Sequence, residues 1–178
     1  MSLTTRQKIE AGIKLKEDAN DLVRKGEYKK ACQLYRRVPG CINGLLSKDD
    51  AQVAQFAGKQ DRLTDEERKE VVELKATVLG NLALCYLKLQ DFPRALQCAE
   101  EATNLDKKNV KAWLRMGIAC NELGQWEKAK DALGAANALE PQNAAITKEI
   151  ATWRAGYNKW LEEQKAKEKA AFGGKLLS

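Results

Sequence analysis

Apolar residues recur along this chain at spacings of three and four, the interval that places side chains on one face of an α-helix. In the stretch NVKAWLRMGIAC, Trp113, Met116 and Cys120 share one face, whereas Lys111 and Arg115 lie four residues apart on the opposite face. Prolines are rare, with three in 178 residues, and Ala, Leu, Lys and Glu are abundant. This mixture favours helices. The pattern therefore predicts an all-α protein.

The helical pattern repeats with a period of 34 residues. An upstream copy over 13–38 carries Ala31, which lies 64 positions before Ala95, so about 30 additional residues separate the first and second copies. Small residues occupy the places where the two helices of a unit must approach each other closely. The pairs that are 34 residues apart are Ala83 with Gly117, Tyr86 with Cys120, Ala95 with Ala129, Ala99 with Leu133, and Ala102 with Ala136.

Period and pattern resemble the tetratricopeptide repeat, in which each unit is a helical hairpin. The resemblance implies an all-α, right-handed superhelical solenoid of three hairpins plus a C-terminal capping helix, in a single domain over 4–170. Thr64-Asp65-Glu66-Glu67 is a capping-box sequence that predicts a long helix through about Leu89. The expected parts are repeat one at 12–38 with an extension and insertion at 39–63, repeat two at 64–109, repeat three at 110–141, the capping helix at 142–170, and a flexible tail at 171–178.

Polar residues on the first helix of each hairpin are candidates for a binding site. In stacked hairpins these helices line the concave side, so their residues outside the core point into one groove. Lys16 and Asn20 of repeat one, Asn81 of repeat two, and Lys111 and Arg115 of repeat three could then converge. Asn is a mediocre helix former, so helix propensity does not explain its presence inside two predicted helices.

These five positions resemble the carboxylate clamp of chaperone-binding tetratricopeptide domains, through KEDAN, NLALC and KAWLR. The one departure is Ala19, where glycine is usual. The resemblance implies that Lys16, Asn20, Asn81, Lys111 and Arg115 bind the peptide carboxylates. The expected partner is the acidic C-terminal peptide, ending in Glu-Glu-Val-Asp, of heat-shock protein 90 or 70 class chaperones. The chain would then be a co-chaperone or adaptor.

The layout over roughly 5–170 resembles the C-terminal half of large immunophilins of the FKBP type, which are peptidyl-prolyl isomerases. No isomerase module precedes Met1, so this chain by itself is not expected to be an enzyme. One alternative is a tetratricopeptide scaffold for another partner, which would tolerate amidation of the peptide's C-terminus. Another is the non-catalytic fragment of a larger isomerase.

The composition excludes several common kinds of catalytic and metal-binding site. There is no histidine, so the usual Ser/Cys-His nucleophile systems and common zinc sites are not expected, and no Gly-rich phosphate loop is present. We therefore expect no catalytic residues, no metal and no cofactor. Five widely spaced cysteines suit a reducing compartment, the cytoplasm or also the nucleus.

The formal net charge of +6 favours acidic partners. Acidic residues are interspersed among the basic ones, and no basic stripe with stacking aromatics is evident, so nucleic-acid binding is not expected. No run of 18 uncharged apolar residues occurs, so no membrane span is expected.

The last predicted helix supports one further alternative. Trp153 and Trp160 lie among basic residues, as in basic amphipathic targets of calmodulin. Glu162, Glu163 and Glu168 dilute that charge. Docking of the aromatic side chains on repeat three is the favoured interpretation, and calmodulin remains an alternative partner.

Overall fold

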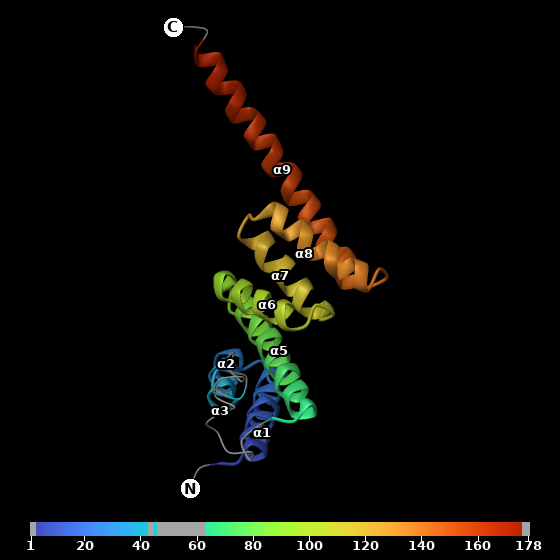
Figure 1. Cartoon of the computed structure of the whole chain (residues 1–178). Coiled ribbons are helices and arrows are strands. Elements are labelled where there is room, and N and C mark those ends of the chain that lie inside the picture. The colour runs from blue at the N-terminus through green and yellow to red at the C-terminus, as the bar shows by residue number, and fades with distance from the viewer. Residues whose placement is uncertain (1–2, 43–44, 46–62, 176–178) are drawn as a thin grey trace.

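The chain forms a stack of helices in the computed structural model, which describes residues 3–42, 45 and 63–175. The described residues contain no strand, as the sequence predicts. The hairpins follow one another along a single direction, and the far end of the last helix projects from the stack (Figure 1). The helices are α1 (Thr5–Arg24), α2 (Tyr28–Tyr35), α3 (Val38–Ile42), α5 (Asp65–Lys88), α6 (Phe92–Leu105), α7 (Val110–Glu122), α8 (Trp126–Leu139) and α9 (Ala144–Lys175).

The long helix α5 begins at the predicted capping box. The Thr64 hydroxyl accepts a hydrogen bond from the Glu67 backbone N–H at 3.1 Å, and the Glu67 carboxylate accepts one from the Thr64 N–H at 3.0 Å. The acidic residues of this first turn also interact favourably with the positive end of the helix dipole. The helix ends at Lys88, one residue before the predicted end, so this prediction is confirmed.

The turn inside each hairpin uses one residue with positive φ. These residues are Gly26 after α1, Gln90 after α5 and Gly124 after α7, with φ of 76°, 59° and 68°. Gln90 and Gly124 are one repeat period apart. Glycine adopts this left-handed conformation without steric cost, whereas the Cβ of Gln90 comes too close to the following carbonyl oxygen. All three hairpins thus share this turn geometry. Two of the turns carry glycine, the residue best suited to positive φ, at Gly26 and Gly124.

Small residues let the paired helices approach each other, as the repeat predicts. Ala31, Ala95 and Ala129 are all fully buried. Helix α7 approaches α8 closely, since a Cβ added to Gly117 would lie 2.6 Å from the side chain of Leu133. That distance is below any ordinary contact, so glycine is required there while Leu133 keeps its place.

The second helix of repeat one is not prolonged without a break, contrary to the sequence-based expectation for residues from 39 onward. Helix α2 ends at Tyr35, a turn occupies 36–37, and the short α3 begins at Val38. Pro39 explains the break, since a proline ring clashes with the carbonyl four residues earlier and has no N–H to donate. Pro39 instead lies in the first turn of α3, where proline is tolerated. The rest of the predicted insertion falls almost entirely outside the described residues.

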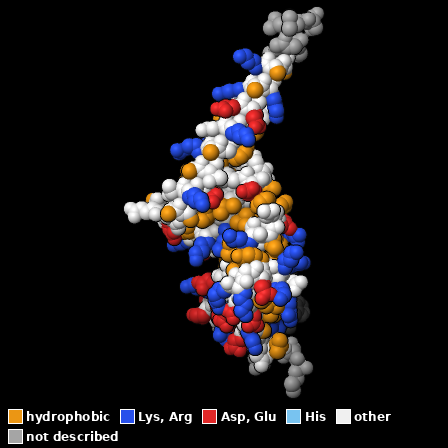
Figure 2. All heavy atoms as spheres, turned by 180° about the vertical axis from the view of Figure 1, so that it is seen from behind, with side chains coloured by type: hydrophobic (Ala, Val, Ile, Leu, Met, Phe, Trp, Pro, Cys, Tyr) orange, Lys and Arg blue, Asp and Glu red, His pale blue; other side chains and the backbone are white. Residues whose placement is uncertain are grey.

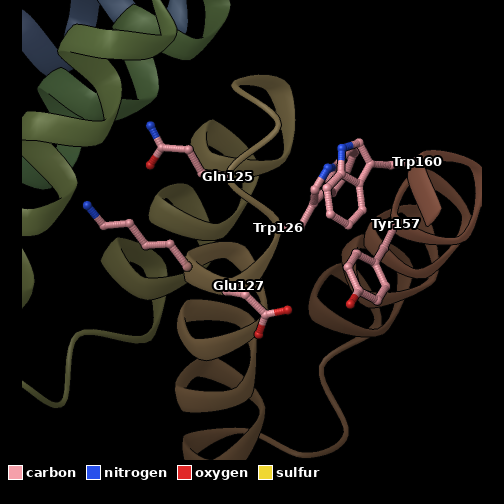
Figure 3. A pocket seen from close by; sticks show the side chains of 6 residues that line it. Gln125, Trp126, Glu127, Tyr157 and Trp160 are labelled. Atoms are coloured by element: carbon pink, nitrogen blue, oxygen red, sulfur yellow. The ribbon is translucent and has the colours of Figure 1, made fainter. Parts of the chain in front are cut away.

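Helix α9 packs on α8 at the C-terminal end of the stack. Asn143 precedes it, and its side-chain oxygen accepts a hydrogen bond from the backbone N–H of Ala145 at 3.0 Å. Ile146 is fully buried, and the Trp153 indole N–H donates to the Trp126 carbonyl at 2.9 Å. Trp126, Tyr157 and Trp160 line a pocket of about 350 Å³ between the two helices (Figure 3). Trp153 thus docks on repeat three as predicted, whereas Trp160 remains 38% exposed.

The helix also extends beyond its predicted end at residue 170. It continues to Lys175, and residues 176–178 of the expected tail lie outside the described ones. The favourable helix formers just before this point can propagate the helix, since each added residue contributes another backbone hydrogen bond.

Acidic and basic side chains alternate over the lower part of the face shown in Figure 2 without separating into single-sign patches. All five cysteines are free. Among the described helices, none combines the length and the apolar character needed to cross a bilayer.

Candidate carboxylate-binding site

A hydrogen bond between two of the predicted site residues joins the first and second hairpins. The Asn81 side-chain N–H of α5 donates to Asn20 Oδ1 of α1 at 3.1 Å, although the residues are 61 positions apart. Both amides are partly buried. The same Asn20 oxygen accepts a second hydrogen bond, from the Tyr35 hydroxyl of α2 at 2.6 Å. Three helices therefore meet at one amide oxygen.

The arrangement determines which amide atoms are left to bind a ligand. An amide oxygen has two lone pairs, and both of those on Asn20 Oδ1 are engaged by these donors. Its Nδ2 group carries two N–H donors and has no hydrogen-bond partner among the described residues. Asn81 donates one of its two N–H groups to Asn20 and retains the other. Unused donors of this kind suit a carboxylate, which only accepts hydrogen bonds.

Arg115 lies on α7, near the part of α5 that carries Asn81. Asn81 and Arg115 are 34 residues apart, so they hold the same position in consecutive repeats, on helices α5 and α7 that contact each other. The guanidinium is close to the backbone of α5, since a Cβ added to Gly80 would lie 3.3 Å from Arg115 Nη1. Electrostatic interactions also couple Arg115 with Tyr35. We call Asn20, Tyr35, Asn81 and Arg115 the polar cluster.

The charge of Arg115 has no acidic partner in the described part of the chain. Its side chain is partly buried, and desolvation lowers the pKa of Arg115 below its ordinary value, opposed by the nearby Cys85 and Tyr35. The guanidinium still carries its charge, because its ordinary pKa is far above neutral pH. A partly desolvated, unpaired cation is costly, and a bound anion would offset that cost.

The two predicted lysines lie one helical turn before their partners, Lys16 before Asn20 on α1 and Lys111 before Arg115 on α7. Lys16 is partly buried and Lys111 is exposed. Neither forms an ion pair with a described acidic residue, in contrast to Arg6, which pairs with Glu70 at 2.7 Å. The structure thus brings Asn20 and Asn81 into direct contact and places the Arg115 guanidinium near Gly80, the residue before Asn81. The two lysines lie on the same helices as Asn20 and Arg115, without an ion pair to a described residue.

Two residues of this site were not predicted from the sequence. Tyr35 is fully buried, and burial raises its pKa to about 12, while the nearby Asn81 amide and the charge of Arg115 oppose that rise. Its hydroxyl therefore stays protonated and can donate at any ordinary pH. Gly80 is the second, because it leaves room for the guanidinium. A signal existed for Tyr35, since the equivalent positions of the other repeats carry Ala99 and Leu133.

Comparison with known proteins agrees with this architecture. The family model described as anaphase-promoting complex, cyclosome, subunit 3, matches residues 73–136. The C-terminal TPR-containing domain of an FK506-binding protein from Plasmodium falciparum superposes with a TM-score of 0.76 at 26% identity, over 92% of this chain and 97% of that chain. The chain folds as a tetratricopeptide-repeat domain. The predicted all-α solenoid of helical hairpins is thereby confirmed.

Curated relatives of this tetratricopeptide domain include an immunophilin named as inactive. The inactive peptidyl-prolyl cis-trans isomerase FKBP6 of Equus caballus is 36% identical over 100 residues, which are 56% of this chain and 32% of the relative. The chain therefore spans about a third of the length of that relative.

A more distant tetratricopeptide structure shares the fold alone. The second TPR domain of human RPAP3, solved in complex with the HSP70 peptide SGPTIEEVD, has a TM-score of 0.61 at 23% identity, over 82% of this chain and 96% of that chain.

Proposed function

We propose that this domain is a non-catalytic adaptor that binds the acidic C-terminal peptide, ending in Glu-Glu-Val-Asp, of heat-shock protein 90 or 70 class chaperones. The contact between Asn20 and Asn81 beside the unpaired Arg115 is the observation that carries the proposal. It brings unused amide donors of two hairpins together, and the guanidinium of Arg115, from the third hairpin, lies near Gly80, the residue before Asn81. The complex of the RPAP3 domain with an Ile-Glu-Glu-Val-Asp peptide supports the choice of ligand. Reduced cysteines suit a cytoplasmic or nuclear site of action.

The chemistry of the ligand fits these groups. A chain ending in aspartate offers two carboxylates within one residue. In the proposed complex, Asn20, Asn81 and Arg115 donate to one of them, while Lys16 and Lys111 supply charge to the other. Charge-assisted hydrogen bonds contribute about 1.5–3 kcal/mol each before ordering costs. Several together support micromolar binding, about −8 kcal/mol.

A titration of labelled peptide, free acid against C-terminal amide, tests the proposal. The free acid should bind at least about tenfold more tightly, because amidation removes one anionic acceptor. The double variant Lys111→Ala with Arg115→Ala should lose most of that affinity.

Lys165→Ala with Lys169→Ala is the matched control for this double variant. Both lysines are exposed on α9, and the change removes the same net charge at the same spacing. It should bind like the unaltered protein. Equal affinity for acid and amide would refute the proposal and favour a scaffold that recognises its partner through apolar contacts.

A further inference from the structure

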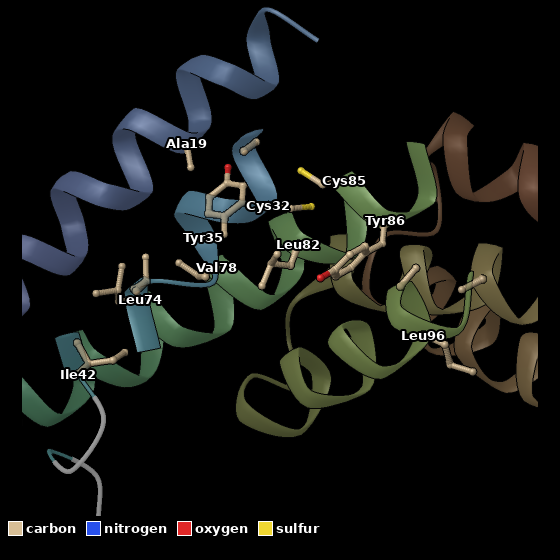
Figure 4. Packing of buried hydrophobic residues seen from close by; sticks show 14 of the residues in the cluster. Ala19, Cys32, Tyr35, Ile42, Leu74, Val78, Leu82, Cys85, Tyr86 and Leu96 are labelled. Atoms are coloured by element: carbon tan, nitrogen blue, oxygen red, sulfur yellow. The ribbon is translucent and has the colours of Figure 1, made fainter. Parts of the chain in front are cut away.

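Tyr35 occupies a place in the fold that does not need a hydroxyl. Its ring is fully buried between α1 and α5, near Ala19 and Leu82 (Figure 4). The equivalent residues of the second and third hairpins are Ala99 and Leu133, which are also buried and have no polar atom in the side chain. Packing alone can therefore be satisfied by an apolar residue. The hydroxyl calls for a separate explanation.

That hydroxyl controls the Asn20 amide. A buried hydroxyl without a partner is costly, so the Tyr35 O–H must donate, and it does so to Asn20 Oδ1 at 2.6 Å. The Asn81 N–H donates to the same oxygen at 3.1 Å. Rotation of the Asn20 amide alone by 180° would place its N–H₂ against the N–H₂ of Asn81, donor against donor. The pair of hydrogen bonds thus holds the Asn20 oxygen inward and leaves its Nδ2 donors available.

We propose that Tyr35 is a positioning residue that orients the Asn20 amide, and through it Asn81, so that their remaining N–H groups are available to a carboxylate. This inference rests on the proposed function for its ligand, but the orientation itself is a property of the free protein. Tyr35 has no role in holding the peptide. It acts by removing the alternative amide orientation, which would present an oxygen to the carboxylate and repel it.

The variant Tyr35→Phe tests this role, because it removes one oxygen and keeps the buried ring. Its affinity for the free-acid peptide should fall about five- to twentyfold, while its affinity for the amidated peptide changes little. Tyr28→Phe on the same helix is the matched control, since the Tyr28 hydroxyl has no hydrogen bond to a described residue. It should bind like the unaltered protein.

A double-mutant cycle separates positioning from general destabilisation. If Tyr35 acts through Asn20, then Tyr35→Phe should have no further effect on affinity once Asn20→Ala is present. A purely structural role would lower affinity equally in both backgrounds, and that result would overturn the inference. Unchanged binding by Tyr35→Phe, in a protein that still discriminates acid from amide, would also overturn it and leave the proposed function standing.

The side-chain amide signals of the free protein give a readout independent of any ligand. In a ¹⁵N–¹H spectrum, with assignments from Asn20→Ala and Asn81→Ala, the Asn20 and Asn81 Nδ2–H₂ signals should shift or broaden in Tyr35→Phe. Unaltered signals would overturn the inference. Shifted signals in a protein that binds acid and amide equally would refute the proposed function alone.

Discussion

The guanidinium of Arg115 lies against Gly80, so closely that a methyl group on Gly80 would come within 3.3 Å of Nη1. Gly80 is in the middle of α5 and directly precedes Asn81. Glycine inside a helix is unfavourable relative to alanine. The glycine that leaves room for Arg115 therefore lowers the stability of α5.

We predict that Gly80→Ala separates stability from binding. The free energy of unfolding should rise by about 0.5–1 kcal/mol, because alanine is the better helix former and the flexible end of Arg115 can move aside. The same movement displaces the guanidinium, so affinity for the free-acid peptide should fall several-fold. Urea unfolding and peptide titration measure the two effects. An increase in affinity would show that Arg115 does not need its place above Gly80.

Salt should weaken peptide binding. Lys111 is exposed, so its interaction with a carboxylate is screened as the Debye length shortens from about 10 Å at 0.1 M salt to about 3 Å at 1 M. Titrations over that range should show affinity falling by about tenfold or more, with a shallower dependence in Lys111→Ala. Binding that is insensitive to salt would indicate an apolar interface instead.

The hairpin turns allow a reciprocal test of backbone strain. Gln90 has φ of 59° at the position that Gly124 fills in the next repeat. Gln90→Gly should raise the free energy of unfolding by about 0.5–1 kcal/mol, because it relieves the left-handed conformation. Gly124→Gln should lower it by a similar or larger amount. Thermal or urea unfolding of both variants checks the prediction, and changes of the same sign in both would contradict it.

Two glycines of repeat three should respond in opposite ways to alanine. Gly117→Ala should destabilise by about 1–3 kcal/mol, because the new Cβ would lie 2.6 Å from Leu133 in a packed core. Gly134→Ala, with nothing within 4 Å of its Cβ, should stabilise by about 0.5–1 kcal/mol through helix propensity. Equal effects in urea unfolding would show that the approach of α7 to α8 is not limited by Gly117.

The repeat made most of the fold predictable. A period of 34 fixes which small residues face each other, and Ala95 and Ala129 are buried as that period requires. The capping box fixes the start of α5 because its two hydrogen bonds are local in sequence. The break before α3 was missed, although Pro39 marks it, because the apolar pattern continues across it. The end of α9 was missed because helix termini in exposed, charged segments lack a packing signal.

The candidate site was predictable only in part. Asn20 and Asn81 stand out as polar residues within helices, and the structure places them in contact. Tyr35 does not stand out by its apolar character, since a buried ring satisfies the same pattern whether or not it carries a hydroxyl. Its role depends on a 2.6 Å contact between helices, which spacing along the chain does not encode.

The central claim is that Asn20, Asn81 and Arg115 bind a carboxylate of a chain end. A thermodynamic cycle between Asn81 and the peptide's α-carboxylate tests it most directly. Affinities of the free-acid and amidated peptides are measured with the unaltered protein, with Asn81→Ala, and with Asn158→Ala on the exposed surface of α9 as control. We predict that amidation costs at least about tenfold in the unaltered protein and in the control, and only a few-fold in Asn81→Ala. An equal cost of amidation in all three proteins would contradict the claim.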